Sequence, residues 1–589
     1  DWGWNTSVKD QGYMGACWTF AFGEAFETAL LRATGIQYNI SQNYLQNLQI
    51  RYSDFGTLTS DEGGVDYMSL ASALGWLSVN EEDDEYDEVG KLSVFVDSPN
   101  KIRLHDAYFI MPNSDNYVED VKKAILNYGA VSVAYASSNA EPYFNEKTSA
   151  HYVNKSLSPN HAVAIVGWDD NYKADNFLIT PPGDGAWIVK NSWASDWGDN
   201  GYFYISYYEK SFFELDQDTG IRYPFTACIF TNTIDYHVNY QTDLNGLYDF
   251  DSNYTQYSNK FIAEYDDLIA GVGTYFNQSG IDYSFDIYVN NNLTHSQSGK
   301  SEFAGYKTII LSKYIPVKVN DTFKVVFKSN ALPYGGFSRT HYVPGISFVS
   351  TDGSTWTDIS LKRKTVCLKV YTVSDDSKIT ENSNISVEYG AQSYFSVKVV
   401  TSDGHAVSGT SVGLSINGKN VNVTTDDEGI AKLEINEAPG IYTLTTVYNN
   451  QSYENKVTVK LNSQNFKVVS KNIAVDYAGG SYFTVKVVSG DGKVAVGGES
   501  VIFIFNGDAV TVKTDKNGIA KIKITQTPGK YTIKTVFNGK TYTNKVTVKQ
   551  VLKASKVTVK KTAKKFTLKT TLKINGKMDK GKTVTIKFN

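Results

Sequence analysis

About the last third of the chain repeats itself, and this repeat limits the possible folds more than any other feature. The segment VEYGAQSYFSVKVV, from Val387, returns as VDYAGGSYFTVKVV from Val475. DDEGIAKLEINEAPGIYTL, from Asp426, returns as DKNGIAKIKITQTPGKYTI from Asp515. The offset of 88 to 89 residues suits a small β-sandwich. The repeats therefore predict tandem all-β domains in place of one large core.

A third copy begins near Val551 and is incomplete. Its stretch FTLKTTLKINGKMDKGKTVTIKFN, from Phe566, aligns without gaps with the segment Phe483 to Asn506. A sandwich that lacks half of its strands cannot bury its core. We therefore expect the natural protein to continue beyond residue 589.

The region from about Thr231 to residue 375 is also rich in strand-like runs. Runs such as LIAGVGTYF, from Leu268, and TFKVVFK, from Thr322, alternate with Asn, Asp, Ser and Gly, which predicts another β-sandwich. The net charge of −5 is small for 589 residues and argues against nucleic-acid binding. No apolar run reaches about eighteen residues, so we expect no membrane span in this chain.

The N-terminal region carries a cysteine at the expected start of a helix. In DQGYMGACWTFAF, from Asp10, apolar residues follow Cys17 at helical spacing, and Gly35 is well placed to end the helix. A thiol on the first helical turn lies near the positive end of the helix dipole, which favours the nucleophilic thiolate. A lone Cys is more often a small core residue, so the rest of the chain decides between these interpretations.

Two later stretches can supply the partners that a thiol nucleophile needs. His161 opens the strand-like run HAVAIVGWD, and Asn191 follows the strand-like run AWIVK. A nucleophilic thiol requires a nearby base, and that base requires a third group to orient it. The amide of Gln11 can stabilise a developing oxyanion together with the backbone N–H of Cys17. Taken singly, His161 is more often a core residue and Asn191 a turn residue, but four such residues in this order are far less expected by chance.

These stretches resemble the motifs of the papain-like cysteine proteases. QGYMGACWTFAF is similar to the nucleophile motif of that family, NHAVAIVGW to its histidine motif and NSWASDWGDNGYFYI to its asparagine motif. The resemblance covers about the first 225 residues. It implies that Cys17 is the nucleophile, His161 the acid and base, Asn191 the residue that orients His161, and Gln11 the oxyanion donor.

The same resemblance implies several substrate-binding residues. Gly63 and Gly64 are similar to a glycine pair whose backbone meets the substrate peptide. Asn160 stands where the family shapes the pocket for the second residue on the acyl side, and Trp193 would shield the hydrogen bond between His161 and Asn191 from water. We expect a protein or peptide substrate, and neither a cofactor nor a metal.

The chain departs from the family's pattern close to the nucleophile. Family members usually carry a Cys where this chain has Met14, bridged to another Cys near the position of Asp61. We therefore expect the nucleophile loop to lack its usual covalent staple. The acidic run EEDDEYDE, from Glu81 to Glu88, matches no calcium-binding spacing and is expected to be a solvated surface loop.

The cysteine count leaves two alternatives for the residues outside the nucleophile motif. Only three cysteines occur, namely Cys17, Cys228 and Cys367. Cys228 and Cys367 either pair with each other or lie separately as buried thiols. Their strand-like surroundings favour two buried thiols.

The chain is therefore predicted to be multidomain, with an α+β papain-like head followed by all-β sandwiches. The region after the head resembles a lectin-like module of microbial surface proteins, and the repeats resemble immunoglobulin-like (Ig-like) repeats of adhesin-like proteins from archaea and bacteria. The predicted domains are residues 1–225 (protease), 226–375 (lectin-like), 376–462 and 463–550 (two Ig-like repeats) and 551–589 (a truncated third repeat).

Together these features predict a cysteine endopeptidase that is extracellular or displayed on a cell surface. The β-domains are candidates for binding a glycan or a cell-wall ligand through exposed aromatic residues, although any single aromatic residue is more often packed in a core. The alternative is a surface adhesin whose protease-like head only binds. The set of Gln11, Cys17, His161 and Asn191 favours the enzyme, because a binding module has no need of all four.

Overall fold

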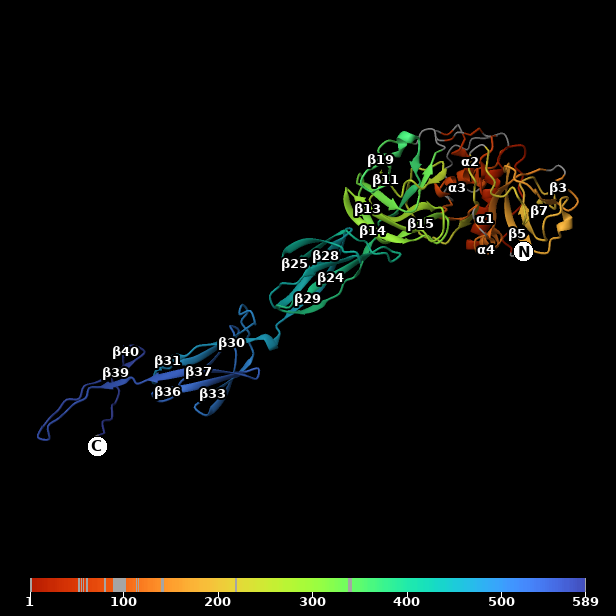
Figure 1. The fold of residues 1–589 in the computed structure, drawn as a ribbon. Helices are drawn as coiled ribbons and strands as arrows, with labels where there is room; N and C mark the ends of the chain where they lie inside the picture. The colour runs from red at the N-terminus through yellow and green to blue at the C-terminus, as the bar shows by residue number, and fades with distance from the viewer. Residues whose placement is uncertain are drawn as a thin grey trace. The chain divides into compact units, whose positions relative to one another are not determined.

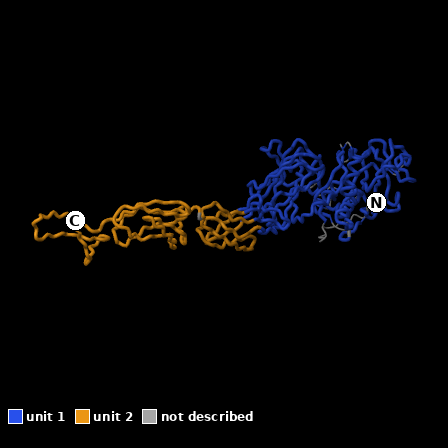
Figure 2. Tube along the Cα trace, turned by 90° about the horizontal axis from the view of Figure 1, so that it is seen from below, with its two compact units in different colours: residues 1–380, 398–411, 424–430 blue, residues 381–397, 412–423, 431–589 orange. Residues whose placement is uncertain are grey.

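A computed structural model represents the chain of 589 residues. It describes residues 3–587 with gaps at 51–52, 54–55, 57, 60–61, 79–80, 88–101, 113, 115, 139–141, 218–219 and 337–341, so Asp61 and Glu88 lie outside the described residues. The chain divides into two compact units (Figure 2). Unit 1 holds residues 1–380, 398–411 and 424–430, and unit 2 holds residues 381–397, 412–423 and 431–589.

The α-helices of the described residues all lie in the N-terminal part of unit 1 (Figure 1). They are α1 (Cys17–Thr34), α2 (Gln42–Asn47), α3 (Asp66–Leu74) and α4 (Tyr117–Asn127). Helix α1 begins at Cys17 as predicted. It ends at Gly35, whose φ of 72° is the left-handed conformation that glycine adopts readily. In the part of the chain that the structure describes, no helix has both the length and the apolar character needed to cross a membrane.

A twelve-stranded sheet runs through unit 1 in the order β3-β4-β7-β6-β5-β2-β8-β1-β15-β12-β21-β9. Strand β1 lies between two partners: Ala107 pairs with Cys228 of β8 on one side and with Tyr306 of β15 on the other. The sheet therefore continues from the predicted protease region into residues 226–375. Its strands are β1 (Asp106–Ile110), β2 (Val131–Tyr135), β3 (Phe144–Asn145), β4 (Ala150–His151), β5 (His161–Asp169), β6 (Ala186–Lys190), β7 (Tyr202–Ser206), β8 (Phe225–Ile229), β9 (Val238–Tyr240), β12 (Asp267–Phe276), β15 (Gly305–Val317) and β21 (Leu368–Ser374).

One hydrophobic core also spans both regions of unit 1. Phe22 and Phe26 of α1 belong to the same buried cluster as Tyr306 of β15. Cys228 and Cys367 are members of this cluster, and both are free, fully buried thiols, which confirms the favoured alternative for these two cysteines. The predicted boundary at residue 225 coincides with the start of β8, inside the shared sheet, and stays a prediction.

A second layer of strands completes residues 226–375. A six-stranded sheet has the order β14-β13-β16-β11-β18-β19, and a three-stranded sheet has the order β10-β17-β20. Phe323, Val325 and Phe327 of β16 are buried at alternate positions, as the strand periodicity predicts. These strands are β10 (Asp249–Asp251), β11 (Gln256–Ile262), β13 (Asp282–Val289), β14 (Asn292–Lys300), β16 (Thr322–Lys328), β17 (Leu332–Gly335), β18 (Ser347–Ser350), β19 (Thr357–Asp358) and β20 (Thr365–Val366).

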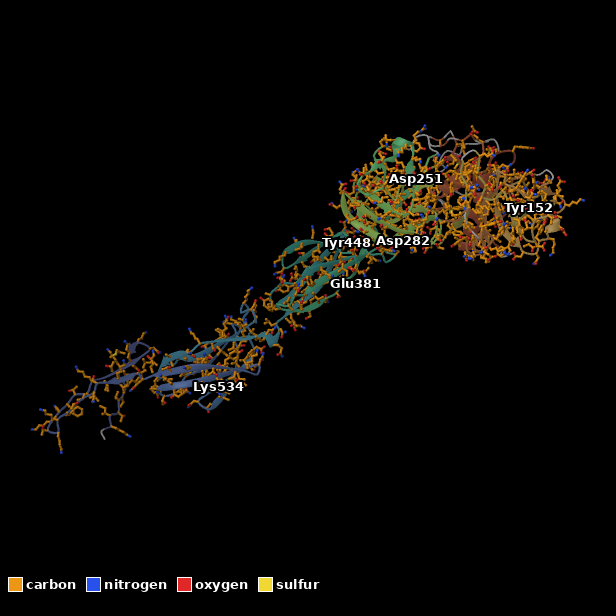
Figure 3. All side chains as sticks on the ribbon, in the orientation of Figure 1. Tyr152, Asp251, Asp282, Glu381, Tyr448 and Lys534 are labelled. Carbon is orange, nitrogen blue, oxygen red and sulfur yellow. The ribbon has the colours of Figure 1, made fainter. Side chains whose placement is uncertain are left out.

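The two complete repeats share one strand order. The second repeat pairs a five-stranded sheet, β31-β37-β36-β33-β34, with a three-stranded sheet, β30-β32-β35, and the five-stranded sheet of the first repeat has the equivalent order β23-β29-β28-β25-β26. Burial alternates along β36: Ile533 is buried, whereas its neighbour Lys534, labelled in Figure 3, is exposed. The third copy has three short strands and mostly exposed residues.

The remaining strands lie between residues 378 and 578. In chain order they are β22 (Lys378–Glu381), β23 (Ile385–Glu388), β24 (Tyr394–Val400), β25 (Ser411–Ile416), β26 (Lys419–Thr424), β27 (Ile430–Glu434), β28 (Gly440–Tyr448), β29 (Gln451–Lys460), β30 (Lys467–Ser470), β31 (Ile473–Asp476), β32 (Tyr482–Val488), β33 (Ser500–Phe505), β34 (Asp508–Lys513), β35 (Ile519–Lys523), β36 (Gly529–Phe537), β37 (Lys540–Lys549), β38 (Leu552–Ala554), β39 (Thr570–Ile574) and β40 (Lys577–Met578).

Candidate active site

Cys17 is the first residue of α1 and is only partly buried, unlike the two other cysteines. The residue before it, Ala16, has no side chain that could cap the helix. The N–H groups of a first helical turn have no partner within the helix. Backbone N–H groups of Cys17, Trp18 and Ala162 point to the thiol and favour its charged form. The sulfur therefore lies among donors suited to a negative charge.

His161 is held in place by Asn191 and covered by Trp193. The distance from His161 Nε2 to Asn191 Oδ1 is 2.9 Å, and Oδ1 also accepts the backbone N–H of Ser192. Since Oδ1 is an acceptor, we assign the ring proton to Nε2, which leaves Nδ1 as the basic nitrogen. The indole of Trp193 stacks on the imidazole, with ring centroids 4.6 Å apart. This stacking keeps water away from the bond between His161 and Asn191.

Gln11 is buried and fixed at both ends of its side-chain amide. Its Oε1 accepts from the Ser192 hydroxyl at 2.6 Å, and its Nε2 donates to the Met14 carbonyl at 2.8 Å. An amide NH₂ has two donors, so one N–H remains for a ligand. Ser192 is a residue that the sequence analysis missed, and its only local signal is its position directly after Asn191.

The loop before Cys17 is held by packing. Met14 is buried in a cluster with Ala16 and Phe20, and Tyr86 packs against this cluster. The Tyr86 hydroxyl donates to the Gln11 carbonyl at 2.7 Å. Met14 therefore helps to hold this loop by noncovalent packing, at the position where the sequence analysis expects no disulfide.

The acidic run that contains Tyr86 is partly turned inward. The prediction of a solvated loop is wrong for Asp84, which is buried and accepts a hydrogen bond from the Ser41 hydroxyl at 3.1 Å. The charge pattern alone could not reveal this, because Ser41 lies 43 residues away in the sequence.

Two ion pairs, one buried and one partly buried, join the helix that carries Cys17 to its neighbours. Lys190, which precedes Asn191, contacts Glu24 of α1 at 2.8 Å, and both side chains are almost fully buried. Lys9 contacts Glu27 of the same helix at 2.7 Å. The Lys190 ammonium also donates to the Thr6 carbonyl. These contacts fix α1 relative to β6 and therefore Cys17 relative to Asn191.

Burial disfavours a charged Cys17 beside a neutral His161, and it equally disfavours a charged His161 beside a neutral Cys17. It raises the pKa of the Cys17 thiol to about 11, although the surrounding backbone N–H groups lower this pKa. It lowers the pKa of His161 to about 4, although the hydrogen bond that the ring donates to Asn191 raises this pKa. The sequence analysis expects the helix terminus to favour the thiolate, and desolvation acts against this effect when the thiol ionises alone. Transfer of the proton from Cys17 to His161 keeps the pair neutral overall and avoids leaving either charge alone.

A cavity of about 370 Å³ opens beside these groups. Both Cys17 and His161 line it, as do Gly63, Gly64 and Asn160. Gly64 has no room for a side chain, since a Cβ atom would lie 2.6 Å from the Trp18 ring. Further lining residues are Gly15, Glu62, Val65, Asp66, Ala134, Pro159, Ala162, Phe213, Glu214, Asp216, Tyr223 and Pro224.

The predicted substrate-binding residues differ in their placement. The Asn160 amide is engaged by Ser137, whose backbone N–H donates to Asn160 Oδ1 at 2.6 Å. Trp193 is absent from the described lining of the cavity and lies over His161 instead. Among the described residues, no three His, Cys, Asp or Glu side chains group closely enough to hold a metal ion.

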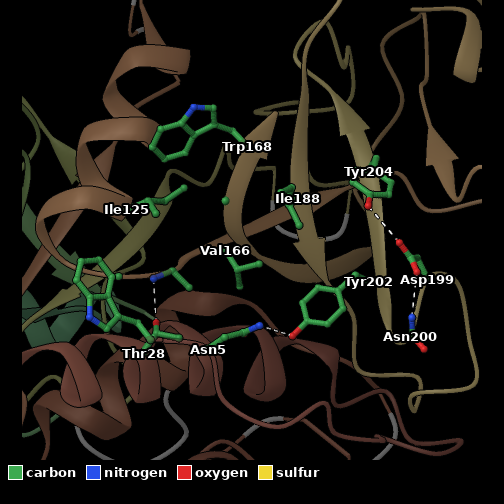
Figure 4. A pocket seen from close by; sticks show the side chains of 14 residues that line it. Asn5, Thr28, Ile125, Val166, Trp168, Ile188, Asp199, Asn200, Tyr202 and Tyr204 are labelled. Carbon is green, nitrogen blue, oxygen red and sulfur yellow. Dashed lines mark hydrogen bonds between the residues drawn. The ribbon is translucent and has the colours of Figure 1, made fainter. Parts of the chain in front are cut away.

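A larger cavity of about 650 Å³ lies elsewhere on unit 1 (Figure 4). Trp168, Ile188, Tyr202 and Tyr204 contribute to its walls. No Cys or His is among its described lining residues, and the hydroxyls of Tyr202 and Tyr204 bind Asn5 and Asp199 respectively. The described lining of this cavity therefore offers no cysteine nucleophile with a histidine base.

Two regions of the chain are similar to known proteins. Residues 1–222 match the papain family of cysteine proteases, and residues 239–372 match a lectin-like domain. Oryzain gamma chain of Oryza sativa subsp. japonica is 30% identical over 203 residues, which cover 33% of this chain and 50% of oryzain. Viral cathepsin of Adoxophyes honmai nucleopolyhedrovirus is 31% identical over 214 residues, which cover 35% and 56% of the two chains. The chain spans about half the length of the curated relatives it matches.

A solved structure shares both regions. It contains the cysteine protease and lectin-like domains of Cwp84, a surface layer associated protein of Clostridium difficile. The TM-score is 0.55 at 23% identity, with 63% of this chain and 87% of that chain covered. At this identity the likeness concerns the fold. The chain thus has a papain-family cysteine protease domain followed by a lectin-like domain.

Proposed function

We propose that the protein is a cysteine endopeptidase in which Cys17 is the nucleophile and His161 the general base and acid. The observation that carries this proposal is the bond of 2.9 Å between His161 and Asn191 beneath Trp193, at the cavity that Cys17 also lines. A base held at one nitrogen and open at the other is what a thiol nucleophile requires. The match of residues 1–222 to the papain family supports the same reaction class.

The reaction begins with transfer of the Cys17 proton to His161 Nδ1. The sulfur then attacks the peptide carbonyl carbon, a C–S bond forms, and the carbonyl oxygen becomes an oxyanion. The free N–H of Gln11 Nε2 and the backbone N–H of Cys17 stabilise this oxyanion. Because Ser192 and Met14 bind the Gln11 amide, its orientation is set before substrate arrives.

The later steps return the enzyme to its initial state. Protonated His161 donates its proton to the leaving amine as the C–N bond breaks. A water molecule then attacks the thioester, and His161 accepts a proton from this water. The C–S bond breaks, the peptide acid leaves, and the proton returns to Cys17.

Labelling and cleavage together test this assignment. Iodoacetamide should label Cys17 first, while the buried Cys228 and Cys367 act as internal controls. Cys17→Ala should abolish cleavage of a peptide library, and Asn191→Ala should reduce it by about 10²-fold, since His161 loses its orienting partner. Earlier labelling of Cys228 or Cys367, or full activity of Cys17→Ala, would refute the assignment.

We also propose that residues 239–372 bind a glycan and that the enzyme acts outside the cell or at its surface. The match to a lectin-like domain supports the first part. The description of Cwp84 as surface layer associated supports the second by analogy. A glycan array probed with full-length Cys17→Ala tests binding without cleavage. An array without any bound glycan would favour a purely structural role for this domain.

A further inference from the structure

We propose that the cavity beside Cys17 receives a positively charged side chain of the substrate, such as that of lysine, and that Asp66 binds its ammonium group. The inference rests on the proposed peptidase function and extends it by naming the substrate class. It depends on the placement of Asp66, on the charges around the cavity and on the shape of its walls.

Asp66 is buried at the cavity with one carboxylate oxygen left over. It is the first residue of α3, and only 7% of its surface is exposed. Its Oδ2 accepts the Ser132 hydroxyl at 2.6 Å. None of the described residues donates a hydrogen bond to its Oδ1. Because Asp66 lines the cavity and Ser132 occupies Oδ2, we infer that Oδ1 is the oxygen available to a ligand.

Apart from His161, which is a cation only while it holds the Cys17 proton, the described lining residues offer no cation to balance this carboxylate. Glu62, Glu214 and Asp216 also line it, and none of its described lining residues is Lys or Arg. Arg222 lies outside the lining and reaches Glu214 at 3.4 Å. A buried carboxylate is costly unless it is paired or fully hydrogen-bonded. One hydroxyl from Ser132 leaves Asp66 short of partners, and a substrate ammonium would supply the missing ones.

The walls suit a long side chain with a charged end. Ala134, Ala162 and the glycines take little space, and the volume of about 370 Å³ exceeds that of any amino-acid side chain. Val65, Phe213 and Tyr223 provide apolar surface for the methylene groups of lysine. A leucine-like side chain would instead cover Asp66 with carbon and remove its water, which costs free energy.

Peptides with a movable lysine test the proposal. A single Lys is placed at each position on the acyl side of an otherwise neutral peptide, and norleucine replaces it in the matched series. At one position the wild-type enzyme should prefer Lys to norleucine in kcat/KM by about tenfold or more. Asp66→Asn keeps the shape and an acceptor for Ser132, and it should lower this ratio by about tenfold. Asp199→Asn, in the other cavity, should leave the ratio unchanged.

The possible outcomes separate this proposal from the peptidase assignment. Cleavage with no preference for Lys at any position, or an unchanged ratio in Asp66→Asn, overturns the role of Asp66 and leaves the peptidase intact. If neither series is cleaved, the peptidase assignment fails. Binding of the same peptides to Cys17→Ala then tests the role of Asp66. Tighter binding of the lysyl peptide supports this role, and equal binding of the two peptides overturns it. If Asp66→Asn fails to fold, the kcat/KM ratio of lysyl to norleucyl peptide in the wild-type enzyme decides the question.

Discussion

The region around Cys17 and the second repeat bury different kinds of side chain. Near the site, Glu24, Lys190 and Asp66 are charged residues in the interior of unit 1. Among the described residues of 463–550, no charged side chain is buried, and the core consists of apolar groups such as Phe503 and Ile533. Alternation of apolar and polar residues is enough to specify a repeat. A reactive site also needs charges at fixed positions, and these require specific partners.

The largest expected effect tests the reactive pair itself. In His161→Ala the thiol must ionise alone, and burial raises its pKa to about 11. Its thiolate is then present only at high pH, so alkylation of Cys17 by iodoacetamide at pH 6 should fall at least about 10³-fold. The wild-type protein should still react at this pH, since proton transfer to His161 supplies the thiolate.

The measurement is the alkylation rate from pH 5 to pH 10. His237→Ala is a matched control, because His237 pairs with Asp267 in β12 and does not line the cavity. Equal rates at pH 6 for the wild type and His161→Ala would show that His161 is not the base.

The next effect tests the charges beneath the site. Lys190→Met leaves Glu24 as a buried charge without its ammonium partner, which should reduce the free energy of unfolding by about 3–5 kcal/mol. Lys173→Met removes an ion pair of similar length, 2.7 Å, but both partners are largely exposed. The control should therefore leave the unfolding midpoint nearly unchanged. Both unfolding midpoints are measured by urea titration of the full chain, with loss of peptidase activity as the signal for unfolding. Equal midpoints in the two variants would contradict the expected difference between buried and exposed ion pairs.

Local features of the site and the repeats could be predicted from the sequence. The helix at Cys17 and its end at Gly35 follow from apolar spacing and glycine chemistry, and the repeats follow from self-similarity. The pairing of Ala107 with Tyr306 could not be predicted, since it joins strands about 200 residues apart that carry no local signal for each other.

The electrostatics of the site were predicted less well. A helix terminus is visible in the sequence, and it favours the thiolate of Cys17. The burial that acts against this effect comes from residues distant in sequence, including Met68 and Ala162, which pack with Cys17. The bond from Ser192 to Gln11 crosses 181 residues and is equally hidden. Tertiary contacts thus set the properties that matter most for reactivity.

A smaller effect concerns the pH dependence of the proposed lysine preference. Burial raises the pKa of Asp66 to about 6, although the hydrogen bond from Ser132 lowers it. As pH falls from 7.5 to 5, Asp66 gains a proton while lysine keeps its charge, so the kcat/KM ratio of lysyl to norleucyl peptide should fall about tenfold. Asp66→Asn should show a low ratio that does not change with pH.

The pH dependence can be assigned to Asp66 because of how the neighbouring titratable groups behave. Burial raises the pKa values of Cys228 and Tyr67 above their usual ranges, so neither titrates between pH 5 and 7.5. The Cys17–His161 pair acts equally on the lysyl and norleucyl peptides and cancels in their ratio. Glu62, Glu214 and Asp216 line the same cavity and remain in the variant. A persistent pH dependence in Asp66→Asn would assign the effect to these three carboxylates instead.

The smallest effect asks whether the repeats are independent of the site. Ile533→Val removes one methylene from the core of the second repeat and should lower the stability of that repeat by about 1 kcal/mol. Ile533 belongs to unit 2, whereas all residues that line the cavity at Cys17 belong to unit 1, so kcat/KM should not change. The exposed neighbour Lys534 gives the matched variant Lys534→Met, which should leave the stability nearly unchanged. Hydrogen exchange of β36 reports the stability and a peptide assay the activity. A parallel loss of activity in Ile533→Val would mean that the apolar core of the repeat and the charged interior of the head are energetically coupled.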